Sequence, residues 1–347
     1  MTDKHAGDHA ILRDDLYGTT PEPTYAGALS FMRRKYTRDL KGVDVAVMGV
    51  PFDTATTNRP GARLGPRAIR SASTIMAWEK PYGTKFDPFD KLAVADIGDC
   101  LFDHGKPESV PAAIEAYAGR IIGEGPALLT LGGDHFISYP LLKAHAEKHG
   151  APLSLLHFDA HSDTWSDEND RIDHGTMFFW AAKHGIVDPA TSVQVGLRTE
   201  NPDTLGFNII DAPQVHDVGV NAVVAEIRRQ LGTRPVYVTF DIDCLDPSYA
   251  PGTGTPVCGG LTSHQALSIP SDTGEPVLFR GSTTGPSYTQ SSCSPFQVTW
   301  SVRPSCAKLD INSLHRWAES GNVFEETKSH GVRQLVTAPE LLAPIGE

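Results

Sequence analysis

The sequence predicts an α/β protein built on a mostly parallel central sheet. Short apolar runs alternate with segments in which apolar residues recur at helical spacing, and this alternation is typical of βαβ units. Polar clusters directly follow several of the apolar runs, as expected where ligands bind at the carboxyl ends of parallel strands. The length of 347 residues suits one large α/β domain or two ordinary ones.

The elements can be assigned in chain order from the spacing of apolar residues. Short apolar runs predict strands at residues 43–50, 92–97, 127–131, 153–158, 192–197 and 236–240. Helical spacing predicts helices that begin at Arg67 and that span residues 111–122, 137–149 and 221–231. Pro66 is a helix start signal for the first of these. A last helix is predicted at residues 262–269, where Pro270 should stop it.

The N-terminal segment does not follow this alternation. Residues 1–42 are predicted to form an extended arm that contains a short basic helix at residues 31–38. Within that helix, Arg33, Arg34 and Lys35 are interpreted as a solvated face rather than as a binding patch.

The composition excludes several classes of protein. A hydrophobic content of 40% and a charged content of 21% are typical of a soluble globular protein, and no apolar run of about 18 residues predicts a membrane span. The net charge of −12 argues against a nucleic-acid partner and is compatible with a small cationic substrate. The N-terminus lacks the apolar segment of a secretory signal, and the five cysteines are dispersed, so we expect a cytoplasmic protein with reduced thiols.

The clearest functional signal lies in residues 153–163. An apolar run ends there in Asp159, His161 and Asp163, which would converge on one side of an extended chain. Two carboxylates and an imidazole on one side can bind a divalent cation. Taken alone, the same segment could also be a polar turn after a buried strand.

Two other predicted strands end in residues of the same kind. His135 follows a Gly-Gly-Asp sequence and, alone, could cap a helix. Asp241 and Asp243 have the same two-residue spacing, although Asp241 alone could be a hydrogen-bonded turn residue. Together these strand ends supply two imidazoles and four carboxylates, too much negative charge for one ion. We therefore expect two divalent ions, and the carboxylate-rich donor set favours Mn²⁺ over structural Zn²⁺.

Three further residues near these strand ends have less certain chemistry. His157 is interpreted as a buried structural histidine that supports the site without binding metal. Asp246, which precedes Pro247, is interpreted as a turn residue. His174 lies in a loop after the metal-binding segment and could be a surface histidine or a proton shuttle.

The chain resembles the ureohydrolases, the superfamily of arginases and agmatinases. The resemblance covers about residues 24–267 and is carried by the Arg-Pro-Gly-Ala-Arg-x-Gly-Pro-x-x-Ile-Arg block at 59–70, the Gly-Gly-Asp-His block at 132–135, the Asp-Ala-His-Ser-Asp block at 159–163 and the block at 241–254 that begins Asp-Ile-Asp-Cys-Leu-Asp-Pro. The segment His-Gly-Thr-Met-Phe at residues 174–178 resembles agmatinases more than true arginases.

This resemblance implies an arginase-type three-layer α/β/α fold and two Mn²⁺ ions per chain. The implied metal ligands are His135, Asp159, His161, Asp163, Asp241 and Asp243. The implied reaction is hydrolysis of a linear guanidino compound to urea and an amine by a hydroxide that bridges the metal ions. Agmatine is the substrate that the resemblance favours most. Asp163 would orient that hydroxide, and His174 would manage protons. Guanidinobutyrase and guanidinopropionase activities are close alternatives, a formimino substrate is a third, and trimers or hexamers are usual in the family.

The resemblance ends at about residue 267, so we divide the chain into an N-terminal arm (1–42), a catalytic core (43–267) and a divergent C-terminal segment (268–347). Thr283 stands where the family has a glutamate that binds the guanidinium group, and Glu275 is a weak substitute. The segment is either an altered end, for instance after a reading-frame change, or a different substructure. We expect it to be poorly packed or partly disordered, with only a short helix at 311–320 and an apolar patch at 332–342. A catalytically impaired oligomer partner is therefore the alternative function.

Overall fold

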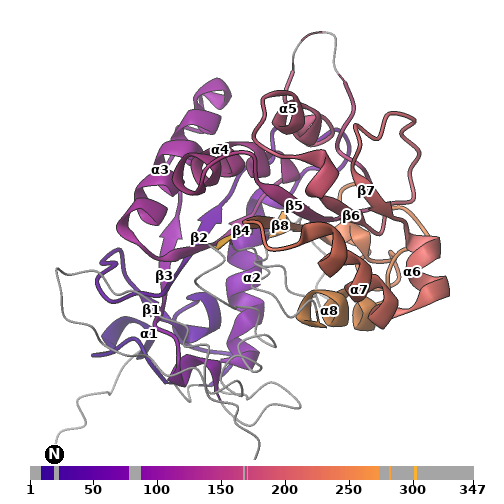
Figure 1. The fold of residues 1–347 in the computed structure, drawn as a ribbon. Helices are drawn as coiled ribbons and strands as arrows, with labels where there is room; N and C mark the ends of the chain where they lie inside the picture. The colour runs from indigo at the N-terminus through magenta and orange to yellow at the C-terminus, as the bar shows by residue number, and fades with distance from the viewer. Residues whose placement is uncertain are drawn as a thin grey trace, which may run out of the picture.

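The computed structural model describes residues 9–18, 23–77, 87–166, 169, 171–272, 281–282 and 301–302. They form an α/β fold (Figure 1). The strands are β1 Lys35–Tyr36, β2 Val45–Val50, β3 Val94–Asp99, β4 Ala127–Gly132, β5 Ser154–Phe158, β6 Val193–Val195, β7 Asn208–Ile210, β8 Val236–Asp241, β9 Gly281–Ser282 and β10 Ser301–Val302. The α-helices are α1 His9–Leu12, α2 Gly65–Ser73, α3 Val110–Glu124, α4 Ser138–His149, α5 Met177–Lys183, α6 Ala212–Val218, α7 Val220–Leu231 and α8 Ser263–Asp272.

The strands form one sheet in the order β1-β3-β2-β4-β9-β8-β5-β6-β7. Every neighbouring pair along this path is parallel, and β10 adds antiparallel to β8. The sheet thus consists of two parallel blocks, β1-β3-β2-β4 and β8-β5-β6-β7, which the two-residue strand β9 joins. Because the strands are parallel, their carboxyl ends all lie at one edge of the sheet.

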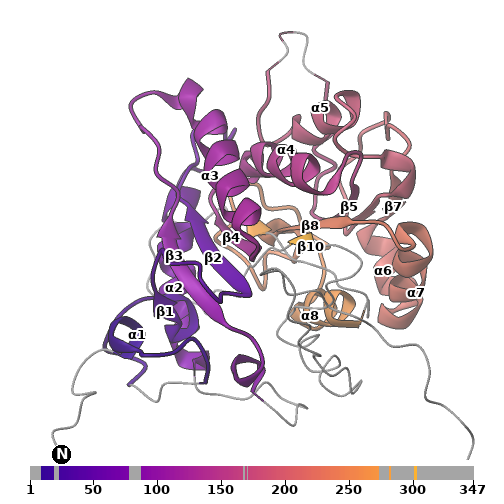
Figure 2. The ribbon, with the colours of Figure 1, turned by 60° about the vertical axis from the view of Figure 1, so that its left-hand side comes forward.

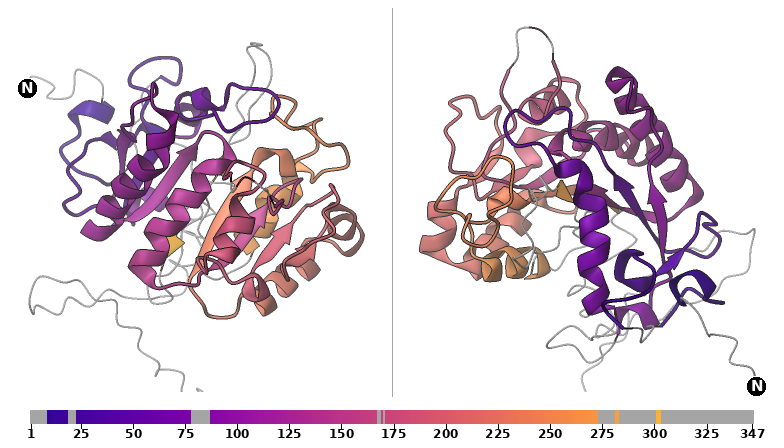
Figure 3. Two further views of the ribbon diagram at one scale, coloured as in Figure 1. Left: turned by 90° about the horizontal axis from the view of Figure 1, so that it is seen from above. Right: turned by 180° about the vertical axis from the view of Figure 1, so that it is seen from behind.

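Helices cover both faces of the first block because alternate strand residues point to opposite faces. In β2, Ala46, Met48 and Val50 belong to a buried cluster that includes side chains of α3, α4 and α5. Val45 and Val47, on the other face of β2, pack in a second cluster with α2. The view from behind shows α2 on the face opposite α3 and α4 (Figure 3).

The second block is covered in the same way. Leu155 of β5 and Tyr237 of β8 join the cluster of α3, α4 and α5. Leu156, Phe158 and Val238 face the other side, where the side chains of α6, α7 and α8 surround them. Figure 2 shows α4 and α5 on one side of these strands and α6, α7 and α8 on the other. The result is the three-layer arrangement that the sequence predicts.

Most predicted elements occur within a few residues of their predicted bounds, but several elements are additional. The sequence predicts neither the short strands β1 and β7 nor the helices α5 and α6. Pro270 does not end the last helix as predicted, since α8 continues to Asp272. The three-part division of the chain remains a prediction.

The interpretation of Arg33 and Arg34 as a solvated face is wrong, and so is the predicted helix at 31–38. A short 3-10 helix, Phe31–Arg33, and strand β1 occupy that segment. Both arginines are about 1% exposed. Arg33 Nη2 donates to Pro23 O at 2.9 Å, and Arg34 Nε donates to Met32 O at 3.0 Å. Main-chain carbonyls, rather than water, solvate these guanidinium groups.

The predictions for the C-terminal segment largely lie outside the described residues. These include the predicted disorder, the helix at 311–320, the apolar patch at 332–342, and the positions Glu275 and Thr283.

None of the helices in the described part of the chain combines the length and the apolar character that crossing a bilayer requires.

A buried ion pair ties α2 to β3. Arg70 Nε and Nη2 donate to the two carboxylate oxygens of Asp96 at 2.7 and 3.0 Å, and Arg70 Nη1 donates to Asp99 at 2.6 Å. Asp96 also accepts the N–H of Phe31 at 2.7 Å. Arg70 and Asp96 are both buried, so each depends on the other for compensation of its charge.

Replacing Arg70 by alanine should lower the free energy of unfolding by about 3–5 kcal/mol, because it leaves the buried Asp96 carboxylate without its cation. Arg67 is exposed on the same helix, and Arg67→Ala should change this free energy by less than about 0.5 kcal/mol. Urea denaturation followed by circular dichroism measures both variants. Equal loss of stability in the two variants would contradict the assigned role of the ion pair.

Candidate metal centre

The ends of β4, β5 and β8 carry the predicted ligands. His135 begins the 3-10 helix His135–Ile137 after β4. Asp159, His161 and Asp163 follow β5, and β8 ends in Asp241, after which a 3-10 helix, Ile242–Cys244, contains Asp243. Since β4, β9, β8 and β5 lie side by side in the sheet, these residues meet at its carboxyl edge.

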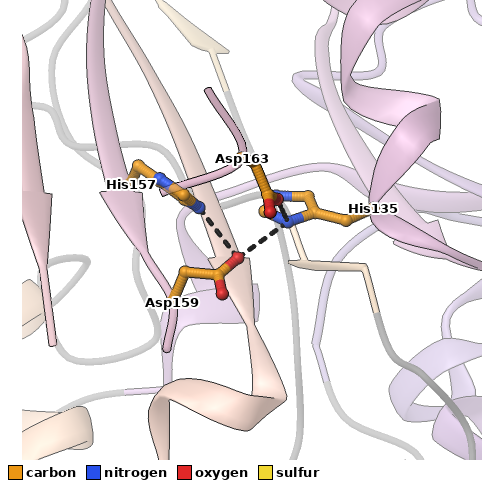
Figure 4. A group of neighbouring side chains, drawn as sticks. All are labelled: His135, His157, Asp159 and Asp163. Atoms are coloured by element: carbon orange, nitrogen blue, oxygen red, sulfur yellow. Dashed lines mark hydrogen bonds and ion pairs between the residues drawn. The ribbon is translucent and has the colours of Figure 1, made fainter. Parts of the chain in front are cut away.

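The first group of donors surrounds the ring of His135. Its Nδ1 atom lies 2.9 Å from Asp159 Oδ2, 2.9 Å from Asp163 Oδ2 and 3.5 Å from Asp241 Oδ2. Figure 4 shows the Asp159 and Asp163 carboxylates reaching this nitrogen from two sides. The other ring nitrogen, Nε2, lies 2.7 Å from Thr239 Oγ1. All these side chains are buried.

The second group surrounds His161. Its Nδ1 atom lies 3.3 Å from Asp159 Oδ1 and 3.1 Å from Asp243 Oδ2. Asp159 therefore belongs to both groups and offers a different oxygen to each. Two sets of side chains have ligand atoms close enough together to hold a metal ion: His135, His157, Asp159 and Asp163 in the first group, and Asp159, His161 and Asp243 in the second.

The separations and directions of the donor atoms are those expected of ligands around a metal ion rather than of hydrogen-bonded partners. His135 Nδ1 is buried and has no hydrogen bond with the described residues, so its contacts with Asp159 and Asp163 lack hydrogen-bond geometry. Atoms bound about 2.1 Å from one ion, roughly 90–110° apart, lie about 3.0–3.4 Å from each other. The measured separations of 2.9–3.5 Å are close to that range. A cation between the donors would also compensate their buried negative charge.

Local hydrogen bonds orient the carboxylates. Asp159 Oδ1 accepts the N–H of His161 at 2.7 Å, and Asp241 Oδ1 accepts the N–H of Asp243 at 3.0 Å. The two-residue spacing that marks both pairs in the sequence is thus also the spacing of a turn closed by an aspartate side chain. Asp241 is a turn residue and a member of the cluster at once, and the helix cap at His135 is supplied by Asp134.

Asp163 departs from the extended chain that the sequence suggested. Its φ of 52° lies in the left-handed region, which costs a residue with a side chain about 1–2 kcal/mol. Its main-chain oxygen accepts the N–H of Phe178 at 3.0 Å, which holds this bend against the start of α5. The bend places the Asp163 carboxylate, like that of Asp159, beside His135 Nδ1, while the ring of His161 lies beside Asp243.

Crowding of charges shifts the protonation of the cluster. Burial, together with the neighbouring Asp159 carboxylate, raises the pKa of Asp163 to about 7. Burial opposes the charged form of His161, but hydrogen bonds to the Asp159 and Asp243 carboxylates outweigh it and raise the pKa of that imidazole to about 12. Protons and metal ions therefore compete for the same donors.

His157 and Asp246 occupy the places that the sequence indicated. His157 is fully buried, its Nε2 atom lies 2.9 Å from Asp159 Oδ2, and burial lowers its pKa to about 4. Its ligand atom therefore lies within the first group of donors. Asp246 accepts the N–H groups of Ser248, Gly259 and Gly260, as a turn residue would, and lies outside both groups.

His174 faces the loop after β2. Its Nε2 atom accepts the main-chain N–H of Thr57 at 3.0 Å and lies 2.8 Å from Thr57 Oγ1. Burial lowers the pKa of His174 and so favours the neutral ring. The next residue of the same loop, Asn58, donates to Gly254 O at 2.8 Å, so this loop joins the His174 segment to the segment after β8.

Arg198 holds the segment after β8 through main-chain carbonyls. Its Nη2 atom donates to Asp243 O at 2.6 Å, to Leu245 O at 3.1 Å and to Val257 O at 2.6 Å. Arg198 cannot be placed from the sequence, and Thr57 is not singled out, because their partners lie far away in the chain: main-chain carbonyls for Arg198 and the His174 side chain for Thr57. Gln194 in β6 is also missed, and its only signal was a polar residue inside an apolar strand.

Comparison with known proteins agrees with this fold. The sequence profile of the arginase family matches residues 43–279. That match spans more than half of the sequence, and the chain belongs to the arginase family. A second profile, that of delta carbonic anhydrase, matches residues 253–313, of which residues 253–272 here pack as part of the arginase fold.

Individual relatives give the same assignment. An agmatinase from Chromobacterium violaceum is 60% identical over 264 residues, which are 76% of this chain and 82% of that protein. The crystal structure of a hypothetical agmatinase from Burkholderia thailandensis has a TM-score of 0.79 and 56% identity, and covers 82% of this chain and 91% of its own. Proclavaminate amidino hydrolase from Streptomyces clavuligerus has a TM-score of 0.68 and 35% identity, covering 76% and 90% of the two chains.

Replacing Gly260 by alanine should weaken the binding of a divalent metal ion by the second group, because the added methyl group would lie 2.5–2.6 Å from Asp246 N, Leu245 C and Arg198 Nη2. Relief of that clash displaces the main chain beside Asp243. The matched control is Gly259→Ala, whose methyl group meets nothing within 4 Å and whose φ of 82° only adds a strain of about 1 kcal/mol. Mass spectrometry of bound Mn²⁺ at limiting metal measures both. Wild-type Mn²⁺ content in the Gly260 variant would refute this assignment.

Proposed function

We propose that this chain is a Mn²⁺-dependent amidinohydrolase that converts a linear guanidino compound to urea and an amine. Agmatine is the substrate that we favour. The observation that carries the proposal is the shared carboxylate Asp159, which presents one oxygen to each of two donor groups at the carboxyl edge of the sheet. The relatives named as agmatinases support the substrate.

In this proposal the chain holds two Mn²⁺ ions. His135, Asp159, Asp163 and Asp241 surround the first, and Asp159, His161 and Asp243 surround the second. Donor separations near 3 Å and a carboxylate-rich set support Mn²⁺. When bound, such a pair of ions lowers the pKa of a water molecule and so supplies a nucleophile near neutral pH, which a poorly electrophilic guanidinium carbon requires.

The remaining chemistry falls to side chains of the chain. Asp163 has an oxygen beside the first donor group, from which it can accept a hydrogen bond from the attacking water and orient it. His174 lies beside the cluster in its neutral form, which can take up a proton and pass it to the leaving amine. Its Nε2 atom, which accepts from Thr57, is the basic nitrogen in this arrangement.

The substrate class has three rivals that the fold does not distinguish. Guanidinobutyrate and guanidinopropionate carry a carboxylate at the end where agmatine carries an amine, and a formimino compound offers a different C–N bond. A catalytically impaired chain that serves as an oligomer partner is the alternative from another class. The intact donor groups favour an enzyme.

Release of urea from agmatine by the full chain loaded with Mn²⁺ tests the proposal. We expect the rate with agmatine to exceed the rates with guanidinobutyrate and guanidinopropionate, and we expect no urea without metal. Urea release from guanidinobutyrate alone would replace the proposed substrate. Bound Mn²⁺ without turnover of any of these compounds, or of a formimino compound assayed by its own product, would favour the impaired partner.

The variant Asp159→Ala is the control for this assay, because it removes the one carboxylate that both donor groups share. We expect loss of both Mn²⁺ binding and urea release. A variant that still binds two Mn²⁺ ions would show that the ligand assignment is wrong.

The variant His174→Gln should lower kcat about 100-fold or more while leaving the Mn²⁺ content unchanged. The side-chain oxygen of glutamine can take the place of Nε2 and still accept the Thr57 N–H, but it cannot carry a proton near neutral pH. Steady-state kinetics at saturating Mn²⁺ measure the effect, with Thr57→Ser as the control that keeps the hydroxyl group. An unchanged kcat in His174→Gln would remove His174 from the mechanism.

We further propose that the chain assembles as a homotrimer or homohexamer in the cytoplasm. The described cysteines Cys100, Cys244 and Cys258 are free thiols, which suits a reducing compartment. Light scattering of the full chain measures its mass and tests the assembly.

A further inference from the structure

The orientation of the Gln194 side chain is fixed by a main-chain carbonyl. Gln194 is buried in β6, and its Nε2 atom lies 2.7 Å from Ser162 O and 3.0 Å from His157 Nδ1. A carbonyl oxygen can only accept, so the atom that faces Ser162 must be the NH₂ group. The other side-chain atom, Oε1, makes no hydrogen bond with the described residues, so the favourable contacts are all on the nitrogen.

This orientation determines which nitrogen of His157 carries the proton. One hydrogen of the Gln194 NH₂ group is directed to Ser162 O, and the second can be donated to His157 Nδ1. Since Nδ1 accepts, the neutral ring carries its proton on Nε2. His157 Nε2 then donates to Asp159 Oδ2 across the observed 2.9 Å. Hydrogen-bond direction thus runs from Gln194 through His157 to Asp159.

This chain of hydrogen bonds from Gln194 through His157 to Asp159, here called the relay, ends on the carboxylate that both donor groups share. Asp159 Oδ2 receives the His157 proton and faces His135 Nδ1, while Asp159 Oδ1 receives the main-chain N–H of His161 and faces its ring. Each carboxylate oxygen of Asp159 therefore accepts one hydrogen bond and also faces one of the two donor groups. Figure 4 shows His157 and His135 reaching the same Asp159 oxygen from different directions.

We propose that Gln194 and His157 are positioning residues that hold Asp159 for metal binding, and that His157 is not itself a ligand. The inference rests on the proposed metal centre. In the tautomer that Gln194 imposes, neither ring nitrogen has a free lone pair for an ion, although His157 lies within the first donor group. Outer hydrogen bonds of this kind typically change metal affinity 10- to about 100-fold.

A pair of His157 variants separates positioning from ligation. In His157→Gln the side-chain NH₂ group takes the place of Nε2–H, whereas in His157→Asn the side chain reaches only to the place of Nδ1. We expect His157→Gln to bind two Mn²⁺ ions within about 3-fold of the wild-type Kd, and His157→Asn to raise the Kd at least about 10-fold. Calorimetric titration of the metal-free chain with Mn²⁺ alone gives both the Kd and the stoichiometry.

The other outcomes overturn the proposal. Loss of one Mn²⁺ ion in both variants would make His157 a ligand. Wild-type affinity in both, with only a lower Tm, would make it a packing residue beside Phe178, whose ring centroid is 4.6 Å away. Any result in which His157→Gln does not bind Mn²⁺ more tightly than His157→Asn contradicts the relay.

The variant Gln194→Met tests the other end of the relay. Methionine is of similar length but has no NH₂ group to donate to His157 Nδ1, so the proton of His157 is no longer fixed on Nε2 and the donor to Asp159 is no longer held. We expect the Kd for Mn²⁺ to rise at least about 10-fold, and an unchanged Kd would overturn the proposal. The control is Ser154→Ala, which removes a buried 2.8 Å hydrogen bond to Thr191 at the opposite end of β5 and should lower Tm without changing the Kd.

These titrations separate the relay from the proposed function. A wild-type chain that binds Mn²⁺ and releases no urea refutes the proposed reaction, while the His157 and Gln194 variants still test the relay. A wild-type chain that binds no Mn²⁺ refutes both.

Discussion

The site depends on one physical constraint, which is that several buried carboxylates meet at one edge of the sheet and must be compensated. Asp159, Asp163, Asp241 and Asp243 are each at most about 5% exposed, so water cannot compensate their charge. Two imidazoles lie among them, but their contacts do not have the geometry of a complete hydrogen-bond network. Metal ions can compensate this charge, and the two groups of donors that could hold an ion share Asp159.

The three-layer fold explains why this cluster can be both buried and precise. The strands that carry it are covered by helices on both faces, so the side chains emerge only where the strands end. The parallel arrangement then brings residues that are about a hundred positions apart in the chain to one edge. The loops beyond that edge, including those of Thr57 and His174, add groups that the sheet itself does not supply.

The sequence predicted the parts of the molecule that depend on local patterns. The two-residue spacing of Asp159 and His161, and of Asp241 and Asp243, marks short turns whose geometry is set within a few residues, so these positions could be identified in advance. The burial of Arg33 and Arg34 could not, because it depends on the carbonyl groups of Pro23 and Gly18, which lie 10 and 16 residues away in the chain.

Long-range partners explain the other differences as well. Gln194, Thr57 and Arg198 all act through atoms more than 30 residues away, and a single sequence carries no sign of those contacts. The short elements β1, β7 and α6 also escaped prediction, because segments this short owe their structure to the layers they pack on rather than to their own periodicity.

Arg198 anchors the segment after β8 in a way that tolerates substitution of the side chains in that segment. Among the described residues, its guanidinium group donates only to main-chain oxygens, at Gly196, Asp243, Cys244, Leu245 and Val257. Every amino acid supplies a carbonyl oxygen, so most side chains along this segment can be exchanged without loss of the anchor. Descendants of such a chain can therefore alter the side chains of this segment while Asp243 at its base stays where it is.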